Sequence, residues 1–164
     1  MIAAVWVVYN LFYRRWVMPL LRDSNVPRHR KVIQPMSQDP ISLANEFFGH
    51  FNANRIDDAL EMLTDDVLYD NVPFPKIVGR ENVRKFHMDF GVGTAFTVDW
   101  EVINIAASGN VVLNERIDVF NHTSGSKITL PVMGTITVEG QKISVWRDYF
   151  DPSDFNEQLA QIKL

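Results

Sequence analysis

The chain has 164 residues, of which 46% are hydrophobic, 16 are basic, 20 are acidic and none is cysteine. This length favours one domain with a hydrophobic core of its own, and the apolar content excludes a disordered chain. The absence of cysteine excludes disulfides, thiolate metal sites and a cysteine nucleophile. A net charge of −4 argues against a protein built to bind nucleic acid.

The charge is unevenly distributed along the chain. Residues 1–35 carry six basic side chains and one acidic one, whereas residues 36–164 carry ten basic and nineteen acidic ones. An apolar run over residues 2–13 opens the basic part, and it is too short to cross a bilayer, which needs about 20 residues. Its arginines follow the apolar run, whereas a secretory signal carries them before it. We therefore predict an N-terminal extension over residues 1–35 and a separate domain over residues 36–164.

Two interpretations of the extension stay open. It is a segment without a packed core, or upstream sequence translated from an early start codon, because Met36 opens a segment that would make a domain by itself. Alternatively, it lies on a membrane surface, with aromatic side chains at the interface and arginines near anionic lipid. The location that we predict is the cytoplasm, with membrane-surface association through residues 1–35 as the alternative.

The domain begins with helical patterns and continues with strands. Apolar spacing predicts helices after Asp39, from Ile56 and after Gly79, with a strand over residues 67–72 before the third helix. From residue 96 onward the pattern alternates and predicts four strands, at about 96–106, 110–121, 127–138 and 142–150, joined by glycine-containing turns. The last fourteen residues predict a closing helix. Helices followed by a meander of strands indicate an α+β fold.

Charged residues lie among large apolar residues on two of these strands. Arg116 and Asp118 share a face with Phe120, and Asp148 shares a face with Trp146. Burying a charge is costly unless it is paired, so this pattern needs an explanation. One explanation is a structural Arg116–Asp118 ion pair with Asp148 on the rim of the sheet. The other is a functional pair of carboxylates that share one arginine at the bottom of an apolar cleft, where one donates a proton and the other accepts one.

Three segments resemble those of the limonene-1,2-epoxide hydrolase family. They are Tyr-Asp-Asn-Val-Pro-Phe-Pro at 69–75, Glu-Arg-Ile-Asp-Val-Phe at 115–120 and Trp-Arg-Asp-Tyr-Phe-Asp at 146–151. Gly79-Arg80 and the strand at 130–134 also fit, so the resemblance covers residues 38–160 in order. It implies a curved mixed or antiparallel sheet packed against three to four helices. The result would be the cone, with a deep apolar pocket, of nuclear-transport-factor-like proteins and ketosteroid isomerase. Family members are usually homodimers that meet through the outer face of the sheet.

The resemblance implies an enzyme that adds water in one step to a hydrophobic epoxide and gives a vicinal diol. The family's catalytic residues map onto Asp118, Arg116, Asp148, Tyr69 and Asn71. Asp148 would act as general base on a water that Tyr69 and Asn71 also hold, and protonated Asp118 would donate to the epoxide oxygen. Arg116 would orient both aspartates. Because Arg116 should lower the pKa of Asp118, burial would have to raise it.

Large apolar residues on the same faces would line the pocket of such an enzyme. The predicted lining residues are Phe51, Phe86, Phe90, Phe120, Leu130, Val132, Trp146, Phe150 and Phe155. The four histidines are scattered, so we predict neither a metal site nor a cofactor, and we place His50 and His87 on helix faces. Two other functions stay open on the same fold. One is isomerisation or cyclisation of a ketosteroid-like or polyketide substrate, and the other is ligand binding without catalysis.

Overall fold

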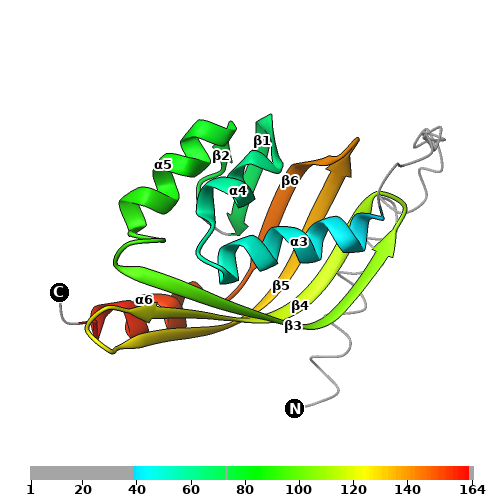
Figure 1. The fold of residues 1–164 in the computed structure, drawn as a ribbon. Coiled ribbons are helices and arrows are strands. Elements are labelled where there is room, and N and C mark those ends of the chain that lie inside the picture. The colour runs from blue at the N-terminus through cyan, green and yellow to red at the C-terminus, as the bar shows by residue number, and fades with distance from the viewer. Residues whose placement is uncertain (1–38, 73, 163–164) are drawn as a thin grey trace, which may run out of the picture. The chain divides into compact units, whose positions relative to one another are not determined.

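The structure is a computed structural model that describes residues 39–72 and 74–162. These residues form four helices and six strands (Figure 1). In chain order they are α3 (Pro40–Asn52), α4 (Ile56–Glu61), β1 (Leu63–Val72), β2 (Ile77–Val78), α5 (Arg80–Phe90), β3 (Phe96–Ser108), β4 (Val111–His122), β5 (Lys127–Glu139), β6 (Lys142–Tyr149) and α6 (Pro152–Ala160). The predicted extension over residues 1–35, with its proposed membrane contact, lies outside the described residues.

All six strands belong to one sheet, in the order β2-β1-β6-β5-β4-β3. The strands β3 to β6 form an antiparallel meander, while β1 pairs in parallel with β6 and antiparallel with β2. Register shifts interrupt the pairing of β1, β3 and β5, and such bulges bend a strand and increase its twist. The predicted α+β class with a curved mixed sheet is confirmed.

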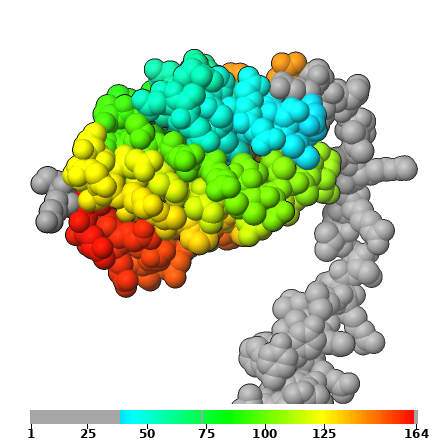
Figure 2. Space-filling view, turned by 60° about the horizontal axis from the view of Figure 1, so that its bottom comes forward, coloured from blue at the N-terminus to red at the C-terminus, as the bar shows by residue number. Residues whose placement is uncertain are grey.

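Two of the helices begin with the same capping arrangement. The side chain of Asp39 accepts a hydrogen bond from the backbone N of Ser42 at the start of α3, as does Asp151 from Ser153 at the start of α6, and a proline follows each aspartate. The helix α3 packs against β3, and α6 packs against β5. In Figure 2, α3 (cyan) and α6 (red) lie on opposite sides of a band of green and yellow strand atoms. The two helices therefore cover different parts of the sheet.

Aromatic rings fill the space between α3 and the sheet. Phe47 packs edge-on against Trp146, with ring centroids 4.9 Å apart, and Phe51 lies 4.5 Å from Trp100. Phe47, Phe51 and both tryptophans are buried. Aromatic pairs in these orientations add stabilisation beyond the area that they bury. The core of the domain therefore lies between α3 and the inner faces of β3 and β6.

The boundaries differ from the predicted ones at β1 and β2. Strand β1 begins at Leu63 rather than at residue 67, because α4 ends at Glu61 and leaves Leu63 buried as the first strand residue. Strand β2 was not predicted, since a strand of two residues shows no alternation. None of the helices in the described part of the chain is long and apolar enough to cross a membrane.

Candidate active site

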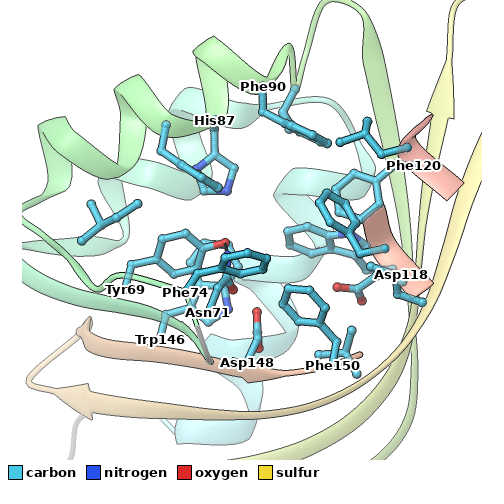
Figure 3. Close-up of a pocket in the computed structure, with 18 of the residues that line it drawn as sticks. Tyr69, Asn71, Phe74, His87, Phe90, Asp118, Phe120, Trp146, Asp148 and Phe150 are labelled. Carbon is cyan, nitrogen blue, oxygen red and sulfur yellow. Dashed lines mark hydrogen bonds between the residues drawn. The ribbon is translucent and has the colours of Figure 1, made fainter. Parts of the chain in front are cut away.

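Three strands bring the five predicted catalytic residues into one place. Strand β4 carries Arg116 and Asp118, β6 carries Asp148, and β1 carries Tyr69 and Asn71. Because alternate residues of a strand point to the same face, each pair shares the inner face of its own strand. The parallel register of β1 and β6 places Asn71 beside Asp148. Figure 3 shows Tyr69, Asn71, Asp118 and Asp148 around one cavity.

The guanidinium of Arg116 lies between the two aspartates. Its Nε donates to Oδ1 of Asp118 at 2.7 Å, and its Nη2 lies 3.2 Å from the second oxygen of the same carboxylate. The same Nη2 lies 2.7 Å from Oδ2 of Asp148. The side chain of Arg116 is fully buried and contacts the rings of Phe48 and Trp100, with its Cζ 5.0 Å and 5.6 Å from the ring centroids. Ion pairs and cation–π contacts together offset the cost of burying this charge.

The pKa values of Asp118 and Arg116 are both raised, but for different reasons. Burial raises the pKa of Asp118 to about 6, although Arg116 acts to lower it and Asp148 adds to the increase. For Arg116, burial alone would lower the pKa, but the negative charges of Asp148 and Asp118 outweigh it and raise the pKa further. Arg116 therefore stays charged, while Asp118 holds a proton more readily than an exposed aspartate does.

Tyr69 and Asn71 form a hydrogen-bonded pair on β1. Nδ2 of Asn71 donates to the hydroxyl oxygen of Tyr69 at 2.7 Å, which leaves the hydroxyl proton and the amide oxygen of Asn71 for other partners. The ring of Tyr69 packs on Trp146 at 4.3 Å. Burial, with the nearby charge of Asp148, raises the pKa of Tyr69 well above its usual range. Tyr69 is therefore a neutral hydrogen-bond donor.

A cavity of about 500 Å³ opens over these polar groups. Tyr69, Asn71, Asp118 and Asp148 all line it. Eight of the predicted lining residues also do so: Phe86, Phe90, Phe120, Leu130, Val132, Trp146, Phe150 and Phe155. Phe51 does not line the cavity, and its prediction as a pocket residue is wrong. It lies in the core behind Trp100 and Trp146, because that face of α3 points at the tryptophans rather than into the cavity.

His87 also lines the cavity and was missed. It was expected on a helix face without a role, but its side chain is buried, stacks on Trp146 at 5.5 Å and has Nδ1 2.8 Å from the carbonyl oxygen of Val83. Burial lowers its pKa to about 4, so the ring is neutral near pH 7. His87 lies four residues after Val83 and three before Phe90, so all three are on one side of α5. This spacing could have identified His87 as a residue on the inner side of the helix. Trp100 and Phe74 line the cavity as well.

Two charged residues next in sequence to the candidate site residues face the other side of the sheet. Asp70 is buried and accepts a hydrogen bond from Nε of Arg147 at 2.8 Å, while Lys76 approaches it to 3.6 Å. The alternation of β1 and β6 predicts this placement. Asp70 and Arg147 therefore form a structural pair outside the site. Among the described residues, no group of three metal-ligating side chains lies close enough to hold a metal ion.

A curved sheet that closes an apolar cavity over two carboxyl groups and a buried arginine defines a class of small α+β domains with a deep apolar pocket. Within that class, the family described as the limonene-1,2-epoxide hydrolase catalytic domain matches residues 38–161. The chain belongs to the limonene-1,2-epoxide hydrolase family.

Among proteins similar to this chain is epoxide hydrolase EphG of Mycobacterium tuberculosis, which is 31% identical over 99 residues. That match spans 60% of this chain and 64% of EphG. A solved M. tuberculosis epoxide hydrolase of the limonene-epoxide-hydrolase-like kind is 26% identical, with a TM-score of 0.65 over 74% of this chain and 90% of its own.

More distant structures share the fold alone. SalBIII, an epoxide hydrolase/cyclase-like enzyme with a role in pyran ring formation in the polyether salinomycin, has a TM-score of 0.63 at 19% identity, over 70% of this chain and 92% of its own. A protein from Catenulispora acidiphila with a ketosteroid isomerase-like fold has a TM-score of 0.61 at 13% identity, over 71% of this chain and 90% of its own. The predicted cone fold is confirmed.

Proposed function

We propose that this protein is an epoxide hydrolase that adds water in one step to a hydrophobic epoxide and releases a vicinal diol. The observation that carries the proposal is the pair Asp118 and Asp148, which share one buried arginine at the wall of an apolar cavity. The raised pKa of Asp118 favours a protonated carboxyl group at that position, as the acid of an acid–base pair requires. An isomerase needs one carboxylate base and a tyrosine or protonated aspartate to stabilise an oxyanion, and it has no need of an arginine between two aspartates. A binding domain has no use for the bridging arginine.

Asp148 is the general base in this proposal. One of its oxygens is bound to Arg116, and each carboxylate oxygen has lone pairs for further donors. A water held by Asp148, by the amide oxygen of Asn71 and by the hydroxyl of Tyr69 has its own oxygen lone pair aimed into the cavity. Because Asn71 and Asp148 are register neighbours and Asn71 is hydrogen-bonded to Tyr69, the three groups converge. Such positioning converts the attack of water into an effectively intramolecular step.

Asp118 is the general acid. As the water oxygen forms a bond to one epoxide carbon, the bond from that carbon to the epoxide oxygen breaks, and the electron pair goes to the oxygen. Protonated Asp118 donates to this oxygen, while Asp148 takes the proton of the water. The pair thus ends each turnover with the proton on the other aspartate, and transfer of a proton from Asp148 to Asp118 restores the starting state. A positioned acid or base contributes roughly 10²–10⁴-fold to the rate.

The cavity determines the kind of epoxide that is accepted. Its walls are mostly aromatic and aliphatic, and its polar groups gather on the strands β1, β4 and β6. A small to medium hydrophobic epoxide would bury its carbon skeleton against the phenylalanines and present its oxygen to Asp118. The proposal needs neither a metal nor an organic cofactor, because the acid, the base and the water supply every proton and bond.

A single turnover in ¹⁸O-labelled water tests the mechanism. Excess enzyme is mixed with each member of a panel of hydrophobic epoxides, and the diol is analysed by mass spectrometry. Label in the diol of the first turnover supports direct attack by water, whereas unlabelled first-turnover diol indicates a covalent ester with an enzyme carboxylate. If no epoxide gives a diol, the isomerase or cyclase and binding alternatives replace the proposal.

We also propose that the protein is a cytoplasmic homodimer. Strands β4, β5 and β6 expose large apolar side chains on their outer faces, namely Leu113, Met133 and Tyr149, each more than 40% exposed. A second copy that covers this face would remove the apolar surface from water. Membrane-surface association through residues 1–35 is the alternative location. Sedimentation velocity tests the assembly, and cell fractionation with a vesicle-binding assay on the full chain tests the location.

A further inference from the structure

Arg116 has a third partner that the proposed reaction does not use. Its Nη1 donates to Oδ1 of Asn114 at 2.7 Å, and Asn114 is almost completely buried. Within the described part of the chain, Nδ2 of Asn114 has no hydrogen-bond partner, which is an unfavourable arrangement for a buried amide. An apolar residue would avoid this cost. The presence of asparagine at position 114 is therefore explained by the hydrogen bond that its oxygen accepts from Arg116, rather than by packing alone.

A glycine lies directly beneath the same group of atoms. Asn114, Gly134 and Asp148 are register neighbours across β4, β5 and β6. A Cβ added to Gly134 would lie 2.6 Å from Oδ1 of Asp148, 2.7 Å from Nη1 of Arg116 and 2.9 Å from Oδ1 of Asn114, distances at which side-chain carbons essentially never approach such atoms. Gly134 does not have a positive φ, so its backbone conformation does not require glycine. Glycine is required because there is no space for a side chain above this position.

We propose that Gly134 and Asn114 are positioning residues for the two carboxyl groups. Gly134 leaves the room in which the polar atoms of three side chains meet, and Asn114 holds the plane of the guanidinium in one orientation by binding Nη1. The guanidinium is planar with its donors in a rigid fork, so with Nη1 bound to Asn114, Nε stays directed at Asp118 and Nη2 stays between Asp118 and Asp148. This role rests on the proposed function of the two aspartates as acid and base.

The physical consequence is control over the separation of the acid and the base. A methyl group on Gly134 must push aside Asp148 or Arg116, and misplacement of reacting groups by about 1 Å costs about 10² in rate. Asn114 acts more locally, since without its oxygen the guanidinium can tilt away from one carboxylate. Neither residue lines the cavity, so substrate binding should change little in either case.

The variant Gly134→Ala tests the first part in the full-length protein. We expect kcat for diol formation to fall about 10²-fold or more, with KM within about threefold of the wild-type value. The matched control is Gly49→Ala on α3, where an added Cβ meets nothing within 4 Å and the backbone is helical, and we expect unchanged kinetics there. Wild-type turnover by a folded Gly134→Ala variant would overturn the proposal. Circular dichroism establishes whether that variant folds.

The pair Asn114→Ala and Asn114→Leu keeps the test decisive if Gly134→Ala does not fold. Leucine has a shape similar to that of asparagine but no oxygen for Arg116, so we expect both variants to lose turnover, by about tenfold or more. A role in packing alone predicts that leucine restores the turnover that alanine loses. The proposal is wrong if either Asn114→Ala or Asn114→Leu turns over like the wild type.

A second measurement does not depend on activity. Carbon-detected ¹⁵N NMR of the arginine side chains reports rotation of the Arg116 guanidinium, which should be slow in the wild type and faster in Asn114→Ala and in Asn114→Leu. If the wild type forms no diol while this pattern is observed, the positioning role stands and the proposed function fails. If diol forms while rotation and turnover are the same in all variants, the positioning role fails and the proposed function stands.

Discussion

The substitution Asp118→Asn should abolish turnover and yet stabilise the protein at neutral pH. Burial raises the pKa of Asp118 from 3.8 to about 6, so between these values the folded state binds a proton more tightly than the unfolded state. The free energy of unfolding therefore falls as the pH rises through this window, by about 3 kcal/mol in total, because each pKa unit is worth about 1.36 kcal/mol. Asparagine has no proton to lose and escapes this penalty.

The measurement is the difference in unfolding free energy between Asp118→Asn and the wild type, as a function of pH. Urea unfolding followed by tryptophan fluorescence gives both values, and the difference should move in favour of the variant by about 2 kcal/mol between pH 4.5 and pH 8. The matched control is the same substitution, Asp99→Asn, at an exposed carboxylate on β3. A difference for Asp118→Asn that does not vary with pH would refute the argument that burial governs this carboxyl group.

Three further predictions follow from the same geometry. Because Asp118 must be protonated to act, kcat/KM should fall about tenfold per pH unit above its pKa of about 6, and a flat profile from pH 6 to 9 in stopped assays would contradict this assignment. Tyr69→Phe should lower kcat about 10²-fold with little change in KM, since only one contact to the water is lost; steady-state kinetics with an unchanged kcat would remove Tyr69 from the proposed set. Burial lowers the pKa of His87 to about 4, so the stability that its neutral ring contributes above pH 6.5 is lost as the pH falls toward 4. Between pH 7 and pH 5 the free energy of unfolding, measured with urea, should therefore fall by about 2 kcal/mol less for His87→Phe than for the wild type. Equal decreases in both proteins would count against this.

The polar half of the site could be predicted from the sequence because a strand has a period of two. Once residues 111–122 are identified as a strand, Arg116 and Asp118 must share a face, and that face proved to be the inner one. The same rule placed Asp70 and Arg147 on the opposite face, where they pair with each other. What alternation cannot give is the distance between strands far apart in the chain. That Asp148 reaches Arg116 depends on the pairing of β6 with β5 and of β5 with β4.

Residues on helices were harder to assign. The spacing of Phe51 correctly indicates a buried residue, but periodicity cannot say whether a buried helix face meets the core or a cavity. His87 was missed because a histidine on a helix is most often exposed. Its spacing from Val83 nevertheless placed it on the buried side of α5. The role of Gly134 was not predicted, although the sequence indicates it. A glycine inside an alternating apolar strand indicates that another group comes close to the backbone, and here that group is the guanidinium of Arg116.

The position of β6 in the sheet determines when the site can exist during folding. It is the last strand of the chain, yet it lies between β1 and β5 in the middle of the sheet. Until it is in place, β1 pairs only with β2 and is not joined to the rest of the sheet, so Asn71 has no contact with the strand that carries Asp148. Closing the long loop between β1 and β6 makes this pairing slow relative to the hairpins β3–β4 and β4–β5. During synthesis Arg116 and Asp118 are therefore in place on β4 before β6 adds Asp148 and joins Tyr69 and Asn71, which are made earlier, to the proposed site.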